Sequence, residues 1–270
     1  MARRRKPAVQ RYHDRVAGRY DATYDDDYWL WHDALTWDHL KPHLPSDTRK
    51  PVLDLGCGTG KWALKLLKSG YPVTCVDISG PMVERARRKI EEAAPTARAS
   101  FVQADLCDLS ELAAGEFALA VAFGDPIGCS TSPPKALKEI RRRLTDDGLL
   151  AATFDNRWAA IDYYLERARP DELDEFLKSG RTHWLTRDRD EQFPIHTYSP
   201  AQAVKLLERA GFEIVDLIGK TVLPMRHHRE LLTDGQARRT WMKIEKRLWR
   251  DPAAIGRAAH IQVIARKSET

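Results

Sequence analysis

The sequence predicts an α/β fold in which helices cover both faces of a parallel sheet. Between residues 51 and 154, short apolar runs alternate with amphipathic stretches of helical spacing, the pattern of successive strand–helix–strand units. The first apolar run leads directly into a loop with three glycines, and a helix follows. The 270 residues, 43% of them hydrophobic, are enough to bury a core without disulfides or metals.

The chain begins with a segment that we interpret as a disordered basic tail, residues 1–9. It contains four consecutive cations, Arg3 to Lys6, and has no apolar periodicity. Lys and Arg number 44 and Asp and Glu 39, so this tail carries most of the net charge of +5. Residues 10–45 are rich in aromatic residues at helical spacing, end at Pro42 and Pro45, and are predicted to form an N-terminal helical lid.

Five strands and three helices are predicted in the alternating region. The expected strands are Val52–Leu55, Val73–Val76, Phe101–Ala104, Phe117–Ala122 and Leu149–Phe154. The expected helices are Lys61–Lys68, Pro81–Ala94 and Pro134–Leu144. Pro81 and Pro134 suit a first helical turn, where a missing N–H costs nothing, and Asp147-Gly148 predicts a turn before the last of these strands.

The alternation is interrupted twice, at residues 157–195 and 224–256, and we interpret both interruptions as cap insertions into a single domain, 10–270. The predicted helices in them are Trp158–Arg167, Asp171–Lys178 and an Arg/Lys-rich helix around Ala237–Trp249. Between and after the insertions the α/β pattern returns as a helix from Pro200 to Ala210 and strands at Phe212–Ile218 and His260–Ala265. No internal repeat is present, which excludes a solenoid.

Several classes of protein are disfavoured by composition. The four cysteines are far apart and form no Cys-x-x-Cys pair, which argues against a zinc knuckle or a disulfide framework and fits the reducing cytoplasm. No apolar run approaches the roughly 20 residues of a membrane helix, and none follows the basic tail as in a secretory signal. His227 and His228 stand between two arginines, which disfavours metal binding, so no metal site is predicted.

The glycine-rich loop and two acidic residues predict a nucleotide site. Gly56, Gly58 and Gly60 let the backbone turn tightly and approach a ligand closely, and the following helix points its N-terminal amides at the same place. Asp77 ends the second strand, where a carboxylate can accept hydrogen bonds from both ribose hydroxyls. Asp105 follows the third strand and can accept a hydrogen bond from an adenine amino group.

The spacing within this loop distinguishes between cofactors. A dinucleotide fingerprint is G-x-G-x-x-G, but Lys61 stands where its last glycine would be. Asp54, just before the loop, suits a ligand with an ammonium group better than one with a pyrophosphate. S-adenosylmethionine has adenine, ribose, a sulfonium and an amino acid, and no phosphate, so it is the predicted cofactor.

At these residues the sequence resembles the class I S-adenosylmethionine-dependent methyltransferases, and within them the small-molecule branch related to the methyltransferases of ubiquinone and menaquinone biosynthesis. The matching segments are Val52–Gly60, Val73–Asp77, Gln103–Leu106, Phe123–Pro126, Leu144–Leu149, His196–Pro200, Ala210–Phe212 and, at the N-terminus, Tyr12–Ala17 with Tyr20-Asp21. The resemblance implies a Rossmann-like three-layer sandwich whose seven-stranded, mostly parallel sheet has its antiparallel last strand between the fifth and the sixth.

The resemblance also implies which residues bind the cofactor. They are Tyr20, Asp54, Gly56, Cys57, Gly58, Gly60, Asp77, Ile78, Met82, Ala104, Asp105, Leu106, Phe123 and Gly124. In such enzymes the glycines line the methionine part, while the acids at the ends of strands two and three hold the ribose and the adenine. Tyr20 matches a tyrosine that often covers the methionine end, whereas most of the other N-terminal aromatic residues are expected in the core.

The expected reaction is an in-line methyl transfer to a small molecule, in which the protein mainly aligns the reactants. Where the acceptor carries a proton, Asp125, His196 and Tyr198 are the candidate general bases, with His183 as a further one. An RNA methyltransferase stays open as an alternative because of the basic tail and the Arg/Lys-rich helix. A dinucleotide oxidoreductase, which Lys61 disfavours, and a non-catalytic cofactor-binding module also stay open.

Overall fold

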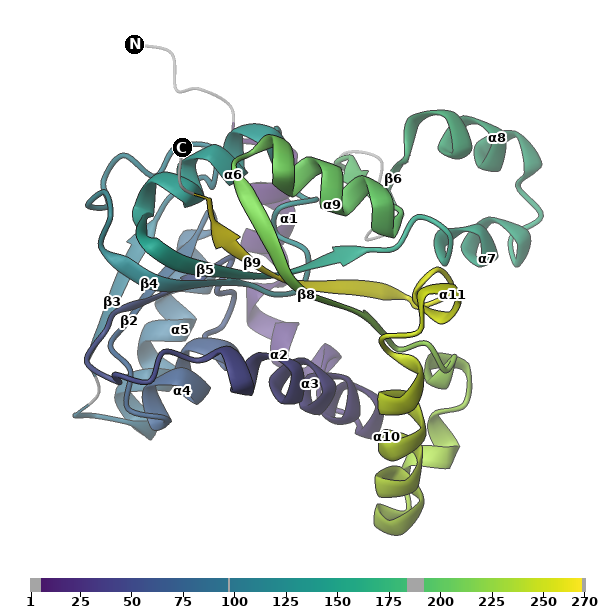
Figure 1. The fold of residues 1–270 in the computed structure, drawn as a ribbon, viewed down its shortest axis with the longest axis horizontal. Helices are drawn as coiled ribbons and strands as arrows, with labels where there is room; N and C mark the ends of the chain where they lie inside the picture. Colours follow the sequence, from purple (N-terminus) through teal and green to yellow (C-terminus); the bar gives the residue numbers. More distant parts are fainter. Residues whose placement is uncertain (1–5, 97, 184–191, 269–270) are drawn as a thin grey trace.

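The computed structural model describes residues 6–96, 98–183 and 192–268, and a seven-stranded sheet forms its centre (Figure 1). The strands are β1 (Val52–Leu55), β2 (Val73–Asp77), β3 (Ala99–Gln103), β4 (Phe117–Ala122), β5 (Leu144–Asp155), β8 (Phe212–Lys220) and β9 (His260–Lys267). Their order across the sheet is β3-β2-β1-β4-β5-β9-β8. β9 lies between β5 and β8 and is antiparallel to both, whereas the other neighbouring strands of this sheet are parallel to each other. The sheet that the resemblance implied is therefore confirmed.

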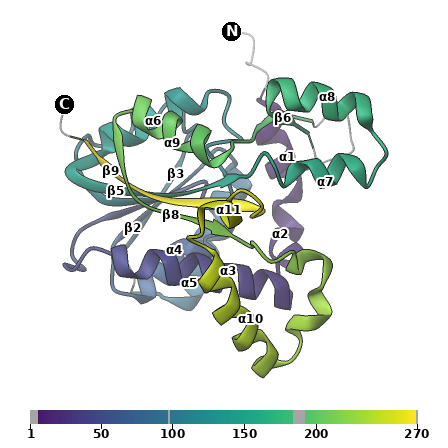
Figure 2. The ribbon, with the colours of Figure 1, turned by 45° about the vertical axis from the view of Figure 1, so that its right-hand side comes forward.

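Helices cover both faces of the sheet, as Figures 1 and 2 show. One face carries α3 (Asp27–Leu40), α4 (Lys61–Lys68) and α5 (Gly80–Ala93). The other carries α6 (Pro133–Arg143) and α9 (Pro200–Arg209). β1 and β4 are buried along their whole length, as expected of central strands covered on both faces.

The helix boundaries follow from local capping. Ser199 accepts a hydrogen bond from the backbone of Gln202, whose side chain in turn accepts one from the Ser199 N–H, and this capping box starts α9. Ser79 caps α5 in a similar way, with Pro81 in the first turn. α4 has no such cap and follows Gly60, which adopts a left-handed conformation.

The N-terminus differs from the prediction. α1 (Ala8–Val16) begins inside the segment that was interpreted as a tail, and the side chain of Val9 packs against Phe193 and Ile195. Assigning residues 8 and 9 to a disordered tail was therefore wrong, because an apolar residue there has a buried partner far along the chain. Residues 1–5 lie outside the described residues. The predicted lid, 10–45, is helical but divided, with short helices η1 (Ala17–Arg19) and α2 (Tyr20–Thr23) between α1 and α3.

The structure also contains features that the sequence did not predict. β5 starts at Leu144, before the predicted turn, and a short hairpin joins β6 (Arg181–Thr182) to β7 (Ile195–His196). The first insertion contains α7 (Ala160–Leu165) and α8 (Pro170–Ser179), which project from the body in Figure 1. The charged run at residues 187–191, which its composition predicts to be a loop, lies outside the described residues.

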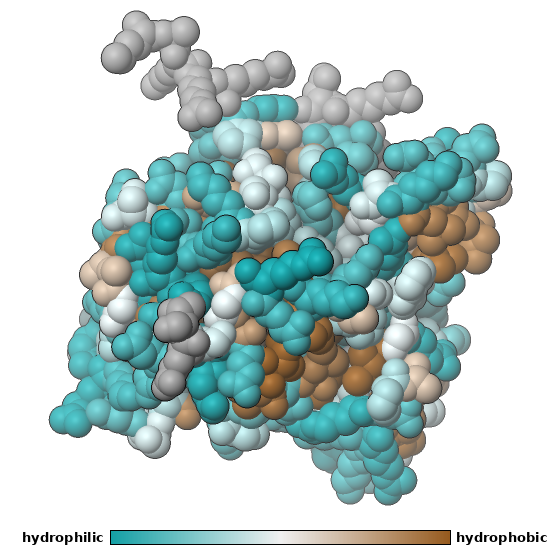
Figure 3. Space-filling view, turned by 45° about the horizontal axis from the view of Figure 1, so that its top comes forward, coloured by the Kyte–Doolittle hydropathy of each residue, from teal (hydrophilic) through white to brown (hydrophobic). Residues whose placement is uncertain are grey.

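The second insertion contains α10 (Gly235–Leu248), α11 (Pro252–Ile255) and the short helices η4 (Met225–His227) and η5 (Arg229–Leu232). α10 packs beside α3. Figure 3 shows a largely hydrophilic face, with hydrophobic residues gathered near the middle and at one edge of the view. Within the described ranges, no helix combines the length and the apolar character that crossing a membrane requires.

Candidate functional site

A pocket lies where β1 to β4 end and their loops meet α1 and Tyr20. Its lining residues are Val9, His13, Tyr20, Gly56, Gly58, Asp77, Ile78, Asp105, Leu106, Phe123, Gly124, Pro126, Cys129, Ser130 and Thr131. Ligands of open α/β sheets bind at this end of the strands. Nine of the predicted cofactor residues are among these: Tyr20, Gly56, Gly58, Asp77, Ile78, Asp105, Leu106, Phe123 and Gly124.

The glycine-rich loop has the conformation that its sequence requires. Gly56, Gly58 and Gly60 have φ angles of 65°, 52° and 82°, which L side chains rarely adopt. A Cβ atom on Gly56 would lie 2.5 Å from Cβ of Pro126. A Cβ on Gly58 would meet no atom closer than Cε1 of Tyr20, 3.7 Å away, so the loop leaves open space on its pocket side.

Asp77 connects the second strand to this loop. Its Oδ2 accepts a hydrogen bond from the Gly58 N–H over 2.9 Å, and its Oδ1 accepts one from the Ser79 N–H over 2.8 Å. Burial raises the pKa of Asp77, while His13 and the two backbone amides act in the opposite direction. Each carboxylate oxygen can accept more than one hydrogen bond, so Asp77 can still bind a pair of ligand hydroxyls.

The far side of the pocket combines a second carboxylate with apolar surfaces. Asp105 holds the turn after β3 by accepting a hydrogen bond from the Cys107 N–H over 2.8 Å. Phe123 packs edge-on against Trp62, with ring centroids 5.0 Å apart. Gly124 has φ 84° and no heavy atom within 4 Å of its Cβ position, so this wall also leaves room for a flat ligand.

The N-terminal segment closes the pocket from above. Asp21, directly after Tyr20, bonds both Thr59 in the glycine-rich loop and Lys89 on α5, the latter over 2.6 Å. Burial would raise the pKa of Asp21, but the hydrogen bonds from Lys89 and Thr59 outweigh it and lower this pKa. The short helix that carries Tyr20 is therefore tied to the loop it covers.

Four predicted cofactor residues do not line the pocket. Cys57 is buried and packs below the loop into the core on the α4 side. Gly60 faces α5, where its Cβ would lie 3.0 Å from Cβ of Ala86. Met82 is fully buried against α1 and η1, and Ala104 packs into the core on the opposite face. These residues pack behind the pocket wall, and their direct contact with the cofactor stays a prediction.

Asp54 is the fifth predicted residue outside the pocket lining. It is 1% exposed beneath the glycine-rich loop, and its Oδ2 has no hydrogen-bond partner among the described residues. Burial raises its pKa to about 7. A buried carboxyl group with a free oxygen under the loop is consistent with the predicted preference for a ligand bearing an ammonium group.

None of the four candidate general bases, Asp125, His196, Tyr198 and His183, lines the pocket. Both oxygens of Asp125 accept backbone hydrogen bonds, from Gly128 over 2.9 Å and from Asp155 over 3.1 Å. Asp125 has φ 57°, an uncommon conformation for a residue with a side chain. Its carboxylate therefore organises the turn after β4, and the structure gives it a supporting position behind the pocket wall.

His196 and Tyr198 lie on the hairpin and the segment after it. The His196 N–H donates to the Gly128 carbonyl oxygen over 2.9 Å. The Tyr198 ring packs edge-on against Phe154, 5.6 Å away, and burial raises the pKa of its hydroxyl. These contacts attach the segment that follows the first insertion to the turn after β4 and to β5.

Six lining residues were not predicted from the sequence: Val9, His13, Pro126, Cys129, Ser130 and Thr131. Pro126 belongs to a segment that was quoted, and the run of small residues after it at the end of β4 was a signal that could have been used. His13 likewise belongs to the matching segment Tyr12–Ala17, whereas Val9 had no such signal, because only the packing of α1 brings it to the pocket.

Outside the pocket, one group has the residue types of a metal site. His39, His43 and Asp216 have ligand atoms within 4.8 Å of one another. Arg250 donates to Asp216 over 2.5 Å, so this carboxylate already has a cationic partner. That the chain has no metal site stays a prediction.

Comparisons with known proteins give a consistent picture. Residues 52–148 match the model of a methyltransferase domain. A demethylmenaquinone methyltransferase of Leptospira interrogans is 31% identical to this chain, over 75% of the chain and 83% of that protein. A tRNA 5-carboxymethoxyuridine methyltransferase of Escherichia coli is 25% identical, over 88% of each.

A solved structure shares the fold. A SAM-dependent methyltransferase from Methanosarcina mazei superposes with a TM-score of 0.60 at 20% sequence identity, covering 86% of this chain and 98% of that one. The two curated relatives have different acceptors in their names, so the comparisons agree on the type of reaction and differ on what receives the methyl group.

Proposed function

This chain belongs to the class I S-adenosylmethionine-dependent methyltransferases, and we propose that it transfers the methyl group of this cofactor to a small-molecule acceptor. The cofactor residues that we propose are those brought together in the pocket. Asp77 would hold the ribose hydroxyls and Asp105 the adenine amino group, with Ile78, Leu106 and Phe123 as apolar contacts. Gly56 and Gly58 would lie against the methionine part, under Tyr20.

The choice of acceptor rests on the ion pairs of the basic helix α10. Four cations, two on α10 and two on the segments that flank it, are paired with acids of α3, of the N-cap residue of α3 and of β8. The pairs are Arg229 with Asp26, Arg238 with Asp27, Lys246 with Asp38 and Arg250 with Asp216. The one acidic residue of α10, Glu245, is fully buried. Much of the charge that could bind phosphates is thus neutralised within the protein, which favours a small molecule over RNA.

The covering of the pocket supports the same choice. α1 and Tyr20 lie over the cofactor pocket, and Asp21 ties this cover to the glycine-rich loop and α5. A bulky folded nucleic acid would need this cover to open, whereas a small molecule would only need the space beside the pocket.

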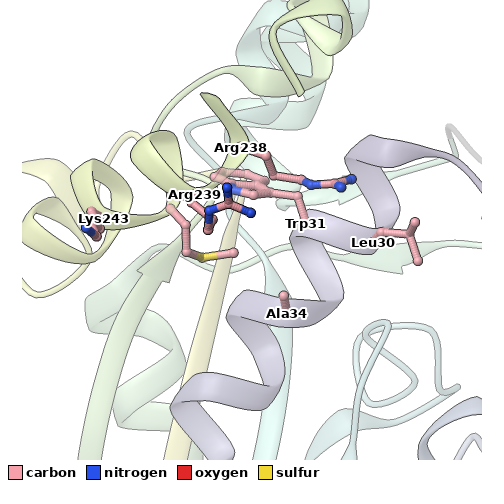
Figure 4. Close-up of a pocket in the computed structure, with 7 residues that line it drawn as sticks. Leu30, Trp31, Ala34, Arg238, Arg239 and Lys243 are labelled. Carbon is pink, nitrogen blue, oxygen red and sulfur yellow. The ribbon is translucent and has the colours of Figure 1, made fainter. Parts of the chain in front are cut away.

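A groove between α3 and α10 favours RNA as a second candidate acceptor. It is lined by Leu30, Trp31, Ala34, Arg238, Arg239, Met242 and Lys243. Figure 4 shows Arg238 and Arg239 beside the indole of Trp31, with Lys243 farther along α10. Arg239 and Lys243 are exposed cations with no ion pair to any described residue. The similarity to a tRNA methyltransferase adds weight to this candidate.

The test supplies methyl-labelled S-adenosylmethionine to the protein with two acceptor pools, a low-molecular-mass filtrate of cell extract and purified bulk tRNA. We expect label in the filtrate and none in tRNA. Label in tRNA that falls with salt, and falls in the Arg239→Glu/Lys243→Glu double variant, would establish the RNA candidate instead. No label in either pool, with S-adenosylhomocysteine still bound, would leave a non-catalytic binding module.

A further inference from the structure

Three ionisable residues meet at the sheet edge beside the cofactor pocket. Asp155 ends β5, His260 begins β9 and Lys220 ends β8. In the strand register, His260 is directly opposite both Asp155 and Lys220. Directly opposed residues of antiparallel strands point to the same face, so the three side chains share one side of the sheet. No other part of the proposed function uses them.

The contacts among these residues orient the imidazole. Nε2 of His260 lies 3.4 Å from Oδ1 of Asp155, and Nδ1 lies 3.5 Å from Oγ1 of Thr221. Thr221 also donates its hydroxyl hydrogen to the Lys220 carbonyl oxygen over 2.6 Å. The imidazole is therefore held between Asp155 on one side and Thr221 on the other.

This pair is adjacent to the cofactor pocket and open to a ligand. The Asp155 N–H donates to Asp125, which lies between the lining residues Gly124 and Pro126. From the other side, the lining residue Tyr20 contacts the ring of Tyr24, with centroids 4.8 Å apart. Burial raises the pKa of the Tyr24 hydroxyl, and the charge of Asp155 contributes to this rise. The side chains of Asp155 and His260 are 17% and 22% exposed.

We propose that Asp155, positioned by His260, is the general base that removes a proton from the acceptor. The inference rests on the proposed function and deepens it, because a base is needed only for an acceptor whose nucleophilic atom carries a proton. It therefore assigns the acceptor to the hydroxyl compounds, amines or acidic carbon compounds, and it excludes carboxylates, which are methylated without loss of a proton.

S-adenosylmethionine, when bound, supplies a methyl group whose bond to sulfur breaks with the electron pair left on sulfur, while the acceptor atom forms the new bond to carbon. The proton of the acceptor passes to the carboxylate of Asp155. The carboxylate that receives the proton lies 3.4 Å from Nε2 of His260.

The surrounding charges leave this carboxylate able to accept a proton near neutral pH. Burial raises the pKa of Asp155 to about 6, against the opposing effects of Arg226 on η4 and Lys220 on β8. Burial lowers the pKa of His260 well below its ordinary value, and His32 on α3 adds to this. Asp125 after β4 and Tyr24 before α3 also face the group. Asp155 is therefore ionised, and His260 neutral, above about pH 6.

The test compares four proteins in the labelled-filtrate assay: wild type, Asp155→Asn, Asp155→Glu and the control Asp38→Asn, which removes a carboxylate from the outer side of α3. We expect Asp155→Asn to lower kcat by about 10²- to 10⁴-fold, the usual contribution of a general base. Its Kd for S-adenosylhomocysteine should stay that of the wild type, and Asp155→Glu should recover part of the rate. The wild-type rate should rise with pH through about 6, and this rise should be absent in Asp155→Asn. In His260→Ala the midpoint of the rise should move.

The outcomes separate the two proposals. If Asp155→Asn and wild type label the filtrate equally, or if the labelled product is a base-labile methyl ester, Asp155 is not the base while the proposed function stands. A loss in Asp155→Asn that appears in KM alone, with the pH profile unchanged, also overturns the inference. No wild-type labelling of the filtrate overturns the proposed function, and the inference that rests on it falls with it.

Discussion

Asp77 has two tasks at the residue scale, because it holds the glycine-rich loop and offers its remaining lone pairs to the pocket. Its two oxygens accept the N–H groups of Gly58 and Ser79, and its side chain lines the pocket. A change at this residue should therefore affect cofactor binding more than any other single change among the pocket residues with an acidic side chain.

We expect Asp77→Ala to weaken S-adenosylhomocysteine binding by roughly ten- to a hundredfold, since each hydrogen bond to a charged group contributes about 1.5–3 kcal/mol and each tenfold change in Kd is about 1.4 kcal/mol. Isothermal titration calorimetry measures this directly. The matched control is Asp108→Ala, an exposed acid in the loop after β3 that lies outside the pocket lining. Equal Kd values for wild type and Asp77→Ala would place the ribose elsewhere.

Gly56 allows a comparison that separates two costs of adding a side chain. Both Gly56 and Gly115 have positive φ angles, 65° and 67°, but a Cβ meets Pro126 at 2.5 Å in the first and nothing within 4 Å in the second. Gly115→Ala should therefore lower the free energy of unfolding only by the conformational cost, about 1–2 kcal/mol, whereas Gly56→Ala should lower it clearly more. Urea unfolding of both variants measures the difference, and equal losses would show that the loop relaxes around the new methyl group.

At the scale of elements, α1 forms part of the pocket although it is remote in sequence from the sheet. Val9 packs with Phe193 and Ile195, and both Val9 and His13 line the pocket. His13 also acts to lower the pKa of Asp77. The N-terminal segment is thus attached at two points, by this cluster and by Asp21.

Two truncations test the role of α1. Removal of residues 1–6 should leave the S-adenosylhomocysteine Kd unchanged, because these residues precede the helix. Removal of residues 1–16 should raise this Kd at least about tenfold, since a wall of the pocket is lost together with its apolar contacts. Calorimetry on both truncated proteins measures these Kd values. An unchanged affinity in the longer truncation would show that α1 does not cover the cofactor.

At the scale of the whole molecule, α3 connects the sheet to the second insertion. His39 on α3 is 1% exposed, and its Nε2 lies 3.2 Å from Oδ2 of Asp216 on β8. Burial lowers the pKa of His39 from 6.5 to about 4, although Asp216 acts in the opposite direction. Between these two values the unfolded chain binds a proton that the folded protein does not, so the stability contributed by this residue is lost as the pH falls from about 6.5 to about 4.

We expect this loss of stability to appear when the wild type is compared with a variant that has no ionisable side chain at position 39. At pH 5 the wild type should have lost about 2 kcal/mol of unfolding free energy relative to pH 7.5 through His39 alone, at about 1.36 kcal/mol per pKa unit. Other buried groups also titrate in this range, so the measured quantity is the difference between wild type and His39→Gln in urea unfolding at both pH values. Parallel pH dependence in the two proteins would contradict the prediction.

Local signals were enough for much of this molecule. β1, α4 and β4 have the predicted bounds, because an apolar run of four to six residues or one amphipathic stretch determines each of them. The glycine-rich loop, Asp77 and Asp105 could be placed in one pocket because the carboxyl ends of successive parallel strands meet at one edge of a sheet. The resemblance supplied the position of β9 between β5 and β8, which periodicity alone does not contain.

Long-range packing decided the rest. Val9 and His13 reach the pocket because α1 docks on residues more than 180 positions away, and no local pattern encodes such a partner. The charges of α10 suggest an open basic face in the sequence, but the ion pairs with α3 exist only once the two helices lie side by side. Asp155 and His260 are 105 residues apart and become neighbours through the register of β5 and β9. The sequence by itself determines most of the strands and helices and the place where a parallel sheet can bind a nucleotide, because these depend on neighbours along the chain. The remaining walls of the site and its acid–base groups were decided by the tertiary structure. They depend on contacts that arise only when distant strands and helices meet.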